Sequence, residues 1–411
     1  MAKHKVLIVG GGFGGVKAAL ELSDRDEFEV TLLSNNTDFR YYPTFYHTAT
    51  GGLKAQSAIP MKEILPADKV RFVLGTAKTL DREKKLIRTG DSRKFHYDTL
   101  IMALGTVTNY FGIEGLDKYS YSIKSLEEIA RFKKHLHEQL TDDRKPELNY
   151  VIIGAGPTGI ELAGALPAYI RHIRKAHKLP RRALHIDLIE AAPRLLPRSG
   201  KKTSRAVRRR LRHLGVQLFV KQAVQAENAD GLVINGKPIQ SHTVVWTAGV
   251  ATNPFYKANG FTMDQRGKVA VDEFLQAEPH IYVLGDNAGT QYSGLAQTAL
   301  ADGRLVAGNL FRTVVRKQKP RPSKPKLPVS VIPVGAGWAA VEWGKIQFSG
   351  KLGWLLRSAA DWIGFKDLQP WWKASEQWLT EFGTQEECPT CIVFEMRQTE
   401  ELGGRKSKRK K

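Results

Sequence analysis

Residues 5–15 read KVLIVGGGFGG, a short apolar run that leads into the pattern GxGxxG at Gly10, Gly12 and Gly15. A brief apolar run bounded by glycines predicts a buried parallel strand, and residues 16–22 predict a helix after it. In such a turn the first glycine permits a tight bend, the second lets a pyrophosphate approach the backbone, and the third lets helix and strand pack closely. The free N–H groups at the start of the helix would then hold the phosphates.

The same pattern occurs a second time in the chain. Residues 149–159 read NYVIIGAGPTG, and a helix is predicted over 160–170. One copy alone is weak evidence, because a strand–helix turn without a ligand has the same pattern. Two copies, each between a strand and a helix, indicate two dinucleotide-binding units that arose by internal duplication.

Further apolar runs predict the rest of two parallel sheets. Strands are expected at 28–33, 70–74, 85–88, 99–103, 184–189, 216–220, 243–247 and 281–284, and a helix at 295–315. Strands that alternate with helices imply helices on both faces of a parallel sheet. The predicted fold class is therefore α/β, with two Rossmann-like dinucleotide-binding domains and a C-terminal amphipathic region.

The composition excludes a disordered or fibrous protein and favours anionic partners. The 411 residues are 42% hydrophobic and 25% charged, as in ordinary globular proteins. There are 63 Lys and Arg against 41 Asp and Glu, and this net charge of +22 suits phosphate-bearing ligands or an acidic lipid surface. The two cysteines, Cys388 and Cys391, are too few for a disulfide framework and fit a reducing compartment.

The residue that ends the second strand of each unit bears on which nucleotide is bound. In the second unit this is Glu190, and a carboxylate there accepts hydrogen bonds from a ribose 2′-hydroxyl and repels a 2′-phosphate. The pattern therefore predicts NADH rather than NADPH. Glu190 is further from the glycines than usual, and we interpret residues 171–182 as an inserted basic loop. In the first unit the position is Ser34, followed by Asn35, which can bond a ribose without charge.

Four further segments complete a resemblance to a known family, and they are 97–106 (YDTLIMALGT), 244–250 (VVWTAGV), 281–286 (IYVLGD) and 296–299 (AQTA). Together with the glycine patterns they resemble the two-dinucleotide-binding-domain flavoproteins. Among these, the chain is most similar to the type II NADH dehydrogenases, the single-chain NADH:quinone oxidoreductases. The resemblance implies that the first unit holds FAD, that the second binds NADH as substrate, and that two electrons pass on to a quinone.

The resemblance also implies how the domains are arranged. The chain crosses to the NADH domain near 97–106 and returns near 244–250, so that the NADH domain is inserted in a discontinuous FAD domain. We expect an FAD-binding domain at 1–112 and 248–315, an NADH-binding domain at 113–247, a Pro/Lys/Arg connector at 316–328, a C-terminal membrane-contact or dimerisation region at 329–402 and a disordered basic tail at 403–411.

Site residues follow from the matching motifs. FAD contacts are expected from Gly10, Gly12, Phe13, Gly14, Gly15, Ser34, Asn35, Ala77, Ala103, Gly105, Thr106, Gly285, Asp286, Ala296, Gln297 and Thr298. NADH contacts are expected from Gly154, Gly156, Thr158, Gly159, Glu161, Glu190, Ala248 and Gly249. Glu161, near the nicotinamide in the family's Gly-x-Glu motif, and Gln297, beside the flavin, are the catalytic candidates, and no metal is expected. Ala301 replaces the family's second glutamine, so one expected quinone-site donor is missing.

Tryptophans gather in the C-terminal region. Seven of the eight lie there, and an amphipathic helix is predicted after Pro370, with Trp371, Trp372, Ser375, Trp378, Leu379 and Phe382 on one face. Such a face suits either the headgroup region of an anionic membrane or a homodimer interface. Glycines and prolines interrupt the weakly charged stretch at 150–170, so no transmembrane helix is expected. The predicted location is cytoplasmic, peripheral on the inner face of the cell membrane.

Two other functions compete with a quinone reductase. One is a soluble NAD(P)H-dependent flavoprotein reductase that serves an iron–sulfur protein or another soluble acceptor. The other is a basic flavoprotein that binds nucleic acid, because residues 205–212 and 171–182 are basic clusters. The chain has no nucleic-acid motif, and 203–214 reads as an ordinary amphipathic helix with a basic face, so no specific nucleic acid is expected. Disulfide reductases and sulfide oxidoreductases are excluded, because no cysteine precedes Cys388.

Overall fold

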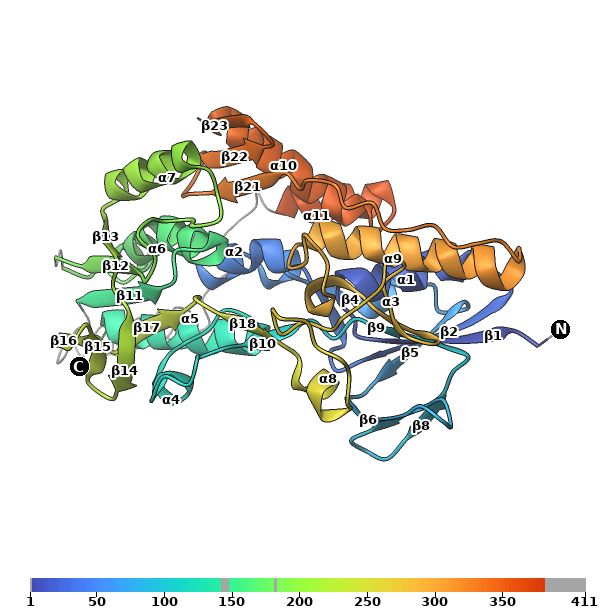
Figure 1. The fold of residues 1–411 in the computed structure, drawn as a ribbon. Coiled ribbons are helices and arrows are strands. Elements are labelled where there is room, and N and C mark those ends of the chain that lie inside the picture. Colours follow the sequence, from blue (N-terminus) through green and yellow to red (C-terminus); the bar gives the residue numbers. More distant parts are fainter. Residues whose placement is uncertain (1, 142–147, 181–182, 381–411) are drawn as a thin grey trace, which may run out of the picture.

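The computed structural model describes residues 2–141, 148–180 and 183–380 (Figure 1). A six-stranded sheet combines N-terminal strands with two strands from later in the chain. Its order is β19 (Gln276–Glu278), β20 (Ile281–Val283), β9 (Thr99–Met102), β1 (His4–Val9), β2 (Phe28–Ser34) and β5 (Val70–Leu74). All neighbours are parallel except β19 and β20. The carboxyl ends of the parallel strands therefore share one edge, where the loops that follow them meet.

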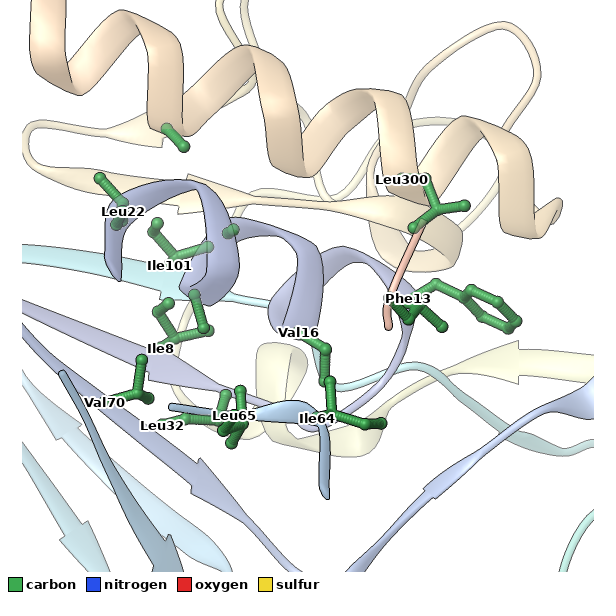
Figure 2. Close-up of a cluster of buried hydrophobic side chains, with 14 of the residues drawn as sticks. Ile8, Phe13, Val16, Leu22, Leu32, Ile64, Leu65, Val70, Ile101 and Leu300 are labelled. Atoms are coloured by element: carbon green, nitrogen blue, oxygen red, sulfur yellow. The ribbon is translucent and has the colours of Figure 1, made fainter. Parts of the chain in front are cut away.

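Both faces of this sheet are buried, which explains why its strands lack polar alternation. Helices α1 (Phe13–Ser23) and α9 (Ala296–Leu310) pack against each other over one face. Figure 2 shows Ile8, Leu32 and Ile101 of the strands in one apolar cluster with Val16 and Leu22 of α1. On the other face, alternate residues of β1 enter a second apolar cluster with α8 (Pro254–Ala258).

The second sheet is four-stranded and parallel throughout. Its order is β13 (Val216–Val220), β12 (His185–Glu190), β11 (Asn149–Ile153) and β17 (Thr243–Trp246). Three helices share one apolar cluster with it, and they are α5 (Leu126–Thr141), α6 (Pro157–Ala176) and α7 (Lys201–His213). The α/β fold class with two parallel-sheet nucleotide-binding units is confirmed. The predicted basic loop at 171–182 is wrong for residues 171–176, because α6 continues as a helix through Ala176, and residues 181 and 182 lie outside the described part of the chain.

The alternation of strands and helices predicts helices on both faces of the second sheet, but helices cover only one face. Its other face packs against an antiparallel meander of β14 (Val224–Asn228), β15 (Gly231–Ile234) and β16 (Lys237–Gln240). The first sheet has a matching meander of β6 (Ala77–Asp81), β7 (Leu86–Thr89) and β8 (Lys94–His96). The recurrence of one helix-covered face and one meander in both units supports the duplication.

A short antiparallel ribbon joins the two sheets. The strand β10 (Thr106–Thr108), which leads away from β9, pairs with β18 (Val250–Thr252), which follows β17. Thr106 lies opposite Thr252, so the outgoing and returning segments run side by side. Smaller elements complete this part of the chain: β3 (Asp38–Arg40), β4 (Ala58–Pro60), α2 (Phe45–Ala49), α3 (Met61–Ile64) and α4 (Leu116–Tyr119).

The C-terminal region contains a small sheet that the sequence did not predict. Strands β21 (Ser330–Pro333), β22 (Ala339–Trp343) and β23 (Ile346–Gly350) form an antiparallel meander, followed by α10 (Lys351–Lys366) and α11 (Trp371–Leu379) (Figure 1). The predicted helix after Pro370 is present as α11. Among the described residues, no helix is long and apolar enough to cross a membrane. The predicted basic tail and the cysteines Cys388 and Cys391 lie outside the described residues.

Candidate functional site

The first glycine loop lies between β1 and α1, and packing fixes two of its glycines. Gly10 has a φ of +118°, and a Cβ there would be 2.1 Å from the Ala103 carbonyl oxygen. A Cβ on Gly15 would be 2.0 Å from the Gly10 carbonyl oxygen. At Gly12, by contrast, nothing among the described residues lies within 4 Å of an added Cβ. The middle glycine therefore leaves open the space that a pyrophosphate would use.

The second glycine loop, between β11 and α6, repeats this arrangement. Gly154 has a φ of +103°, and its Cβ would be 2.6 Å from Cα of Ala248. A Cβ on Gly159 would be 1.9 Å from the Gly154 carbonyl oxygen, whereas Gly156 faces open space within the described part of the chain. Of the three glycines in each GxGxxG pattern, the first and third are thus required by close backbone contacts and the middle one is not. The middle position of each loop therefore has room for a pyrophosphate.

The residues at the ends of the second strands lie against these loops. A Cβ on Gly11 would be 2.7 Å from Ser34 Oγ. In the second unit, Glu190 Oε2 accepts a hydrogen bond from the Ala155 N–H at 2.7 Å, and Oε1 accepts one from Ala192 N–H at 2.8 Å. Both side chains stand where a ribose attached to the pyrophosphate would begin.

Other predicted FAD residues gather at the same edge of the six-stranded sheet. The carbonyl of Gly105 accepts from Asn287 Nδ2 at 2.7 Å, and a Cβ on Gly285 would be 3.2 Å from Ala299 Cβ on α9. The N–H of Gly75, two residues before Ala77, bonds to the Ser34 carbonyl. Predicted residues with exposed side chains are Asn35, Thr158, Ala248 and Gln297. Gln297 Nε2 donates to the Val329 carbonyl at 3.0 Å. All predicted FAD and NADH contacts stay predictions.

Charged groups that the sequence did not single out surround Asp286. Burial raises the pKa of Asp286, while the ammonium groups of Lys268 and Lys124 oppose that rise. Lys124 Nζ donates to Thr106 Oγ1 at 2.8 Å, and burial lowers the pKa of both lysines. Asp302 Oδ2 accepts from the Gly285 N–H at 3.0 Å, and burial raises the pKa of Asp302 to about 6. Lys124 precedes α5, so each unit contributes a residue to this group.

Glu161, a predicted catalytic residue, lies in the first turns of α6 with a side chain that is 12% exposed. Its Oε1 is 3.6 Å from Nη1 of Arg357, which comes from α10 of the C-terminal region. Burial raises the pKa of Glu161 to about 8, against the attraction of Arg357. The sequence did not predict this partner. A signal exists in hindsight, because Arg357 is the only charged residue between Lys351 and Asp361.

Comparison with known families decides the membership of this chain. The model of a family described as pyridine nucleotide-disulphide oxidoreductase matches residues 4–303. The chain belongs to this family. Residues 4–303 of this chain, which match the family, contain no cysteine. In the described part of the chain, no group of three or more His, Cys, Asp or Glu could hold a metal ion.

Relatives within this family carry a consistent name. The chain is 28% identical over 384 residues to the type II NADH:quinone oxidoreductase NdhA of Mycobacterium tuberculosis, covering 86% of this chain and 82% of that protein. It is 28% identical over 334 residues to the type II NADH:quinone oxidoreductase of Staphylococcus saprophyticus, covering 75% and 82%. The solved structure of NDH2 from Plasmodium falciparum in complex with NADH has the same fold, with a TM-score of 0.82 at 17% identity, covering 93% and 98%.

Proposed function

We propose that this protein is an FAD-dependent NADH:quinone oxidoreductase that works at a membrane surface. The observation that carries this proposal is the pair of equivalent glycine loops between strand and helix, each with a middle glycine whose added Cβ would face open space. The curated relatives named type II NADH:quinone oxidoreductase support the choice of reaction. The overall reaction, NADH + H⁺ + quinone → NAD⁺ + quinol, takes up one proton from solvent for each pair of electrons.

The residues at the first glycine loop fit FAD. The space over Gly12 accepts the pyrophosphate, the Ser34 hydroxyl offers an uncharged partner to the adenosine ribose, and Asp286 offers a carboxylate to the ribityl hydroxyls. When bound, FAD supplies the ability to take a hydride and to release two electrons. Lys124 and Lys268 place positive charge beside Asp286 and lower the cost of burying a reduced, more negative group there.

The residues at the second glycine loop fit NADH. Gly156 leaves room for the pyrophosphate, and the Glu190 carboxylate accepts from the ribose 2′-hydroxyl while repelling the 2′-phosphate of NADPH. Glu161, which keeps its proton at neutral pH because of its raised pKa, can donate a proton inside the site. These residues bind, orient and protonate, and the redox chemistry remains that of the cofactors.

The surface of α10 supports a membrane as the place of action. Its apolar residues Leu352, Leu355, Leu356, Ala359 and Ile363 all face solvent at helical spacing. On α11, Trp371 and Trp372 are 63% and 57% exposed, whereas Trp378 packs toward α10 and donates to the Ser358 carbonyl. A helix with an outward apolar stripe suits the lipid interface, and the net charge favours an anionic leaflet. We place the protein on the inner face of the cell membrane.

An anaerobic titration tests the function. Purified protein that carries FAD is mixed with NADH, and in parallel with NADPH, while the flavin absorbance is followed. We expect bleaching by NADH, slower bleaching by NADPH, and return of the colour when a short-chain quinone is added. A protein that retains no flavin, or a flavin that NADH does not bleach, would contradict the proposal. Bleaching without recovery by quinone, together with recovery by a soluble iron–sulfur protein, would favour the soluble reductase instead.

A further inference from the structure

Three distant parts of the chain meet in one buried cluster of charged and polar side chains. Glu161 comes from α6, Arg357 and Asp361 from α10, and Tyr41 from the segment between β3 and α2. The side chains of Arg357 and Asp361 are 10% and 3% exposed. The cluster exists because α10 turns its apolar stripe outward and its charged residues inward.

The two carboxylates compete unequally for the single guanidinium. Arg357 Nε donates to Asp361 Oδ2 at 2.6 Å, whereas Nη1 is 3.6 Å from Glu161 Oε1. The Asp361 carboxylate also accepts from the Tyr41 hydroxyl, to Oδ1, at 2.9 Å. Nη2 of Arg357 donates to the Pro43 carbonyl at 2.6 Å, which fixes the plane of the guanidinium. Asp361 therefore holds the close contact and Glu161 the distant one.

A buried group of two carboxylates and one guanidinium is close to neutral only if one carboxyl keeps a proton. Asp361, with two hydrogen-bond donors, is the better place for negative charge. Burial raises the pKa of Glu161, and the charge of Asp361 adds to that rise. Tyr46 faces Arg357, and His47 faces Asp361 with a pKa that burial lowers, so His47 adds no charge at neutral pH.

We propose that Asp361 is a positioning residue that draws Arg357 away from Glu161 and so keeps a proton on Glu161. The effect of Asp361 on turnover rests on the proposed function. In that reaction a quinone oxygen that gains electrons must also gain a proton. The Glu161 carboxyl gives its proton to that oxygen, becomes a carboxylate, and regains a proton from water. Tyr41 assists by holding Asp361, and Gly364 permits this, since a Cβ there would be 2.5 Å from the Tyr41 hydroxyl oxygen.

The first test needs no turnover. Thermal unfolding of the FAD-loaded protein is measured from pH 5 to pH 9 for the wild type, Asp361→Asn, Glu161→Gln and the double variant. Glu161 has a folded-state pKa above its unfolded one, so its ionisation lowers stability as pH rises through that folded value. Asp361→Asn frees Arg357 to pair with Glu161, which lowers the folded-state pKa of Glu161. We therefore expect the loss of stability to end at a pH lower by about one unit or more, and the variant to lose less stability by pH 9. In the Glu161→Gln background, Asp361→Asn should leave the profile above pH 7 unchanged, whereas below pH 7 the loss of the Asp361 charge also lowers the pKa of His47. Asp302 and Glu227 also titrate in this range, but they are the same in all four proteins.

An identical pH profile for Asp361→Asn and the wild type would overturn the proposal. If Asp361→Asn does not fold, Tyr41→Phe replaces it, because loss of one hydrogen bond to Asp361 should shift the profile in the same direction by less. Asp361→Glu, which keeps the charge, should keep a profile closer to wild type than Asp361→Asn does.

The second test separates this proposal from the proposed function. Flavin bleaching by NADH is measured first in the wild type and Asp361→Asn. The alkaline limb of reoxidation by a short-chain quinone should then be at lower pH in Asp361→Asn than in the wild type. A wild type that reduces no quinone would refute the function and leave the thermal comparison standing. Normal quinone reduction with the same pH profile in both proteins would refute the role of Asp361 and leave the function standing.

Discussion

The carboxylate of Glu190 accepts a hydrogen bond from the backbone N–H of Ala155, at 2.7 Å, across the turn between β11 and α6. The acid at the end of one strand is thereby tied to the glycine loop that follows the neighbouring strand. In the first unit, Ser34 stands in the same place against Gly11. The two units thus share one geometry and differ in charge at the position that we propose contacts the ribose.

This difference predicts how the protein chooses its nucleotide. Glu190→Gln removes the charge that repels a 2′-phosphate and weakens the acceptor for a 2′-hydroxyl. We expect NADH to lose about tenfold in affinity and the preference over NADPH to narrow by at least that factor. The rates of flavin bleaching at varied nucleotide concentration measure both. Glu138→Gln, on the exposed face of α5, is the control and should change neither. A variant that still discriminates as the wild type does would show that Glu190 does not contact the ribose.

The main strands and the two turns were predictable because local chemistry dictates them. The run at Val6–Val9 has apolar side chains on both faces, as a strand needs in a sheet that is covered on both sides. Gly10 and Gly15 must be glycine because the backbone approaches them closely. The sequence could not show what covers the second face of each sheet. Short antiparallel strands such as Leu86–Thr89 carry the same apolar signal whichever sheet they join.

The candidate site was predictable only for residues in or beside the two glycine loops. Gly12, Gly156, Ser34 and Glu190 lie at strand ends, and their positions follow from the strand–turn–helix pattern. Asp361 and Arg357 were missed because the chain segments that bring them to Glu161 are almost two hundred residues apart, and nothing local sets such a contact. The extension of α6 through Ala176 was missed because basic residues suit a solvated helix end as well as a loop.

Gly12→Val should abolish retention of FAD without unfolding the protein. Gly12 has φ −87° and ψ −170°, an extended conformation that any residue adopts, and a Cβ there meets nothing among the described residues. The valine side chain would therefore occupy only the space of the pyrophosphate. FAD content per purified chain and thermal unfolding are the measurements. Gly156→Val is the matched control, which should keep FAD and lose the response to NADH.

Ser34→Ala tests the weaker contact of the same site. One uncharged hydrogen bond contributes on the order of 1 kcal/mol, so we expect FAD affinity to fall by about threefold to tenfold. Dialysis of the holoprotein followed by FAD titration measures the change. A loss as complete as that in Gly12→Val would mean that Ser34 supports the loop itself, against which it packs.

Trp371→Ser combined with Trp372→Ser should weaken binding to membranes. Both rings are more than half exposed, and each would bury apolar area in a lipid interface. Loss of both rings should therefore lower vesicle binding by at least about tenfold. Co-sedimentation with vesicles of equal parts phosphatidylglycerol and phosphatidylcholine measures this, and added salt should weaken the wild type further. Phe219→Ser, an exposed aromatic residue on β13, is the control. Unchanged vesicle binding by the double variant would contradict a membrane role for α11. A dimer that the wild type forms and the double variant does not would assign α11 to a protein interface.

Glu227→Gln should stabilise the protein at high pH and leave it unchanged at low pH. Glu227 lies on β14 with a 6% exposed side chain, its Oε2 has no hydrogen-bond partner among the described residues, and burial raises its pKa to about 8. The folded protein therefore favours the protonated carboxyl, and stability is lost as pH rises from the unfolded value, about 4.3, through about 8. Chemical unfolding at pH 9 should show Glu227→Gln more stable than wild type by about 1 kcal/mol or more, and at pH 4 little difference. The control is Glu114→Gln. Glu114 is exposed, and its carbonyl accepts a hydrogen bond from the Glu227 N–H, so this variant should match the stability of the wild type at both pH values. An equal effect of the two substitutions at pH 9 would show that Glu227 is ionised in the folded protein at no cost.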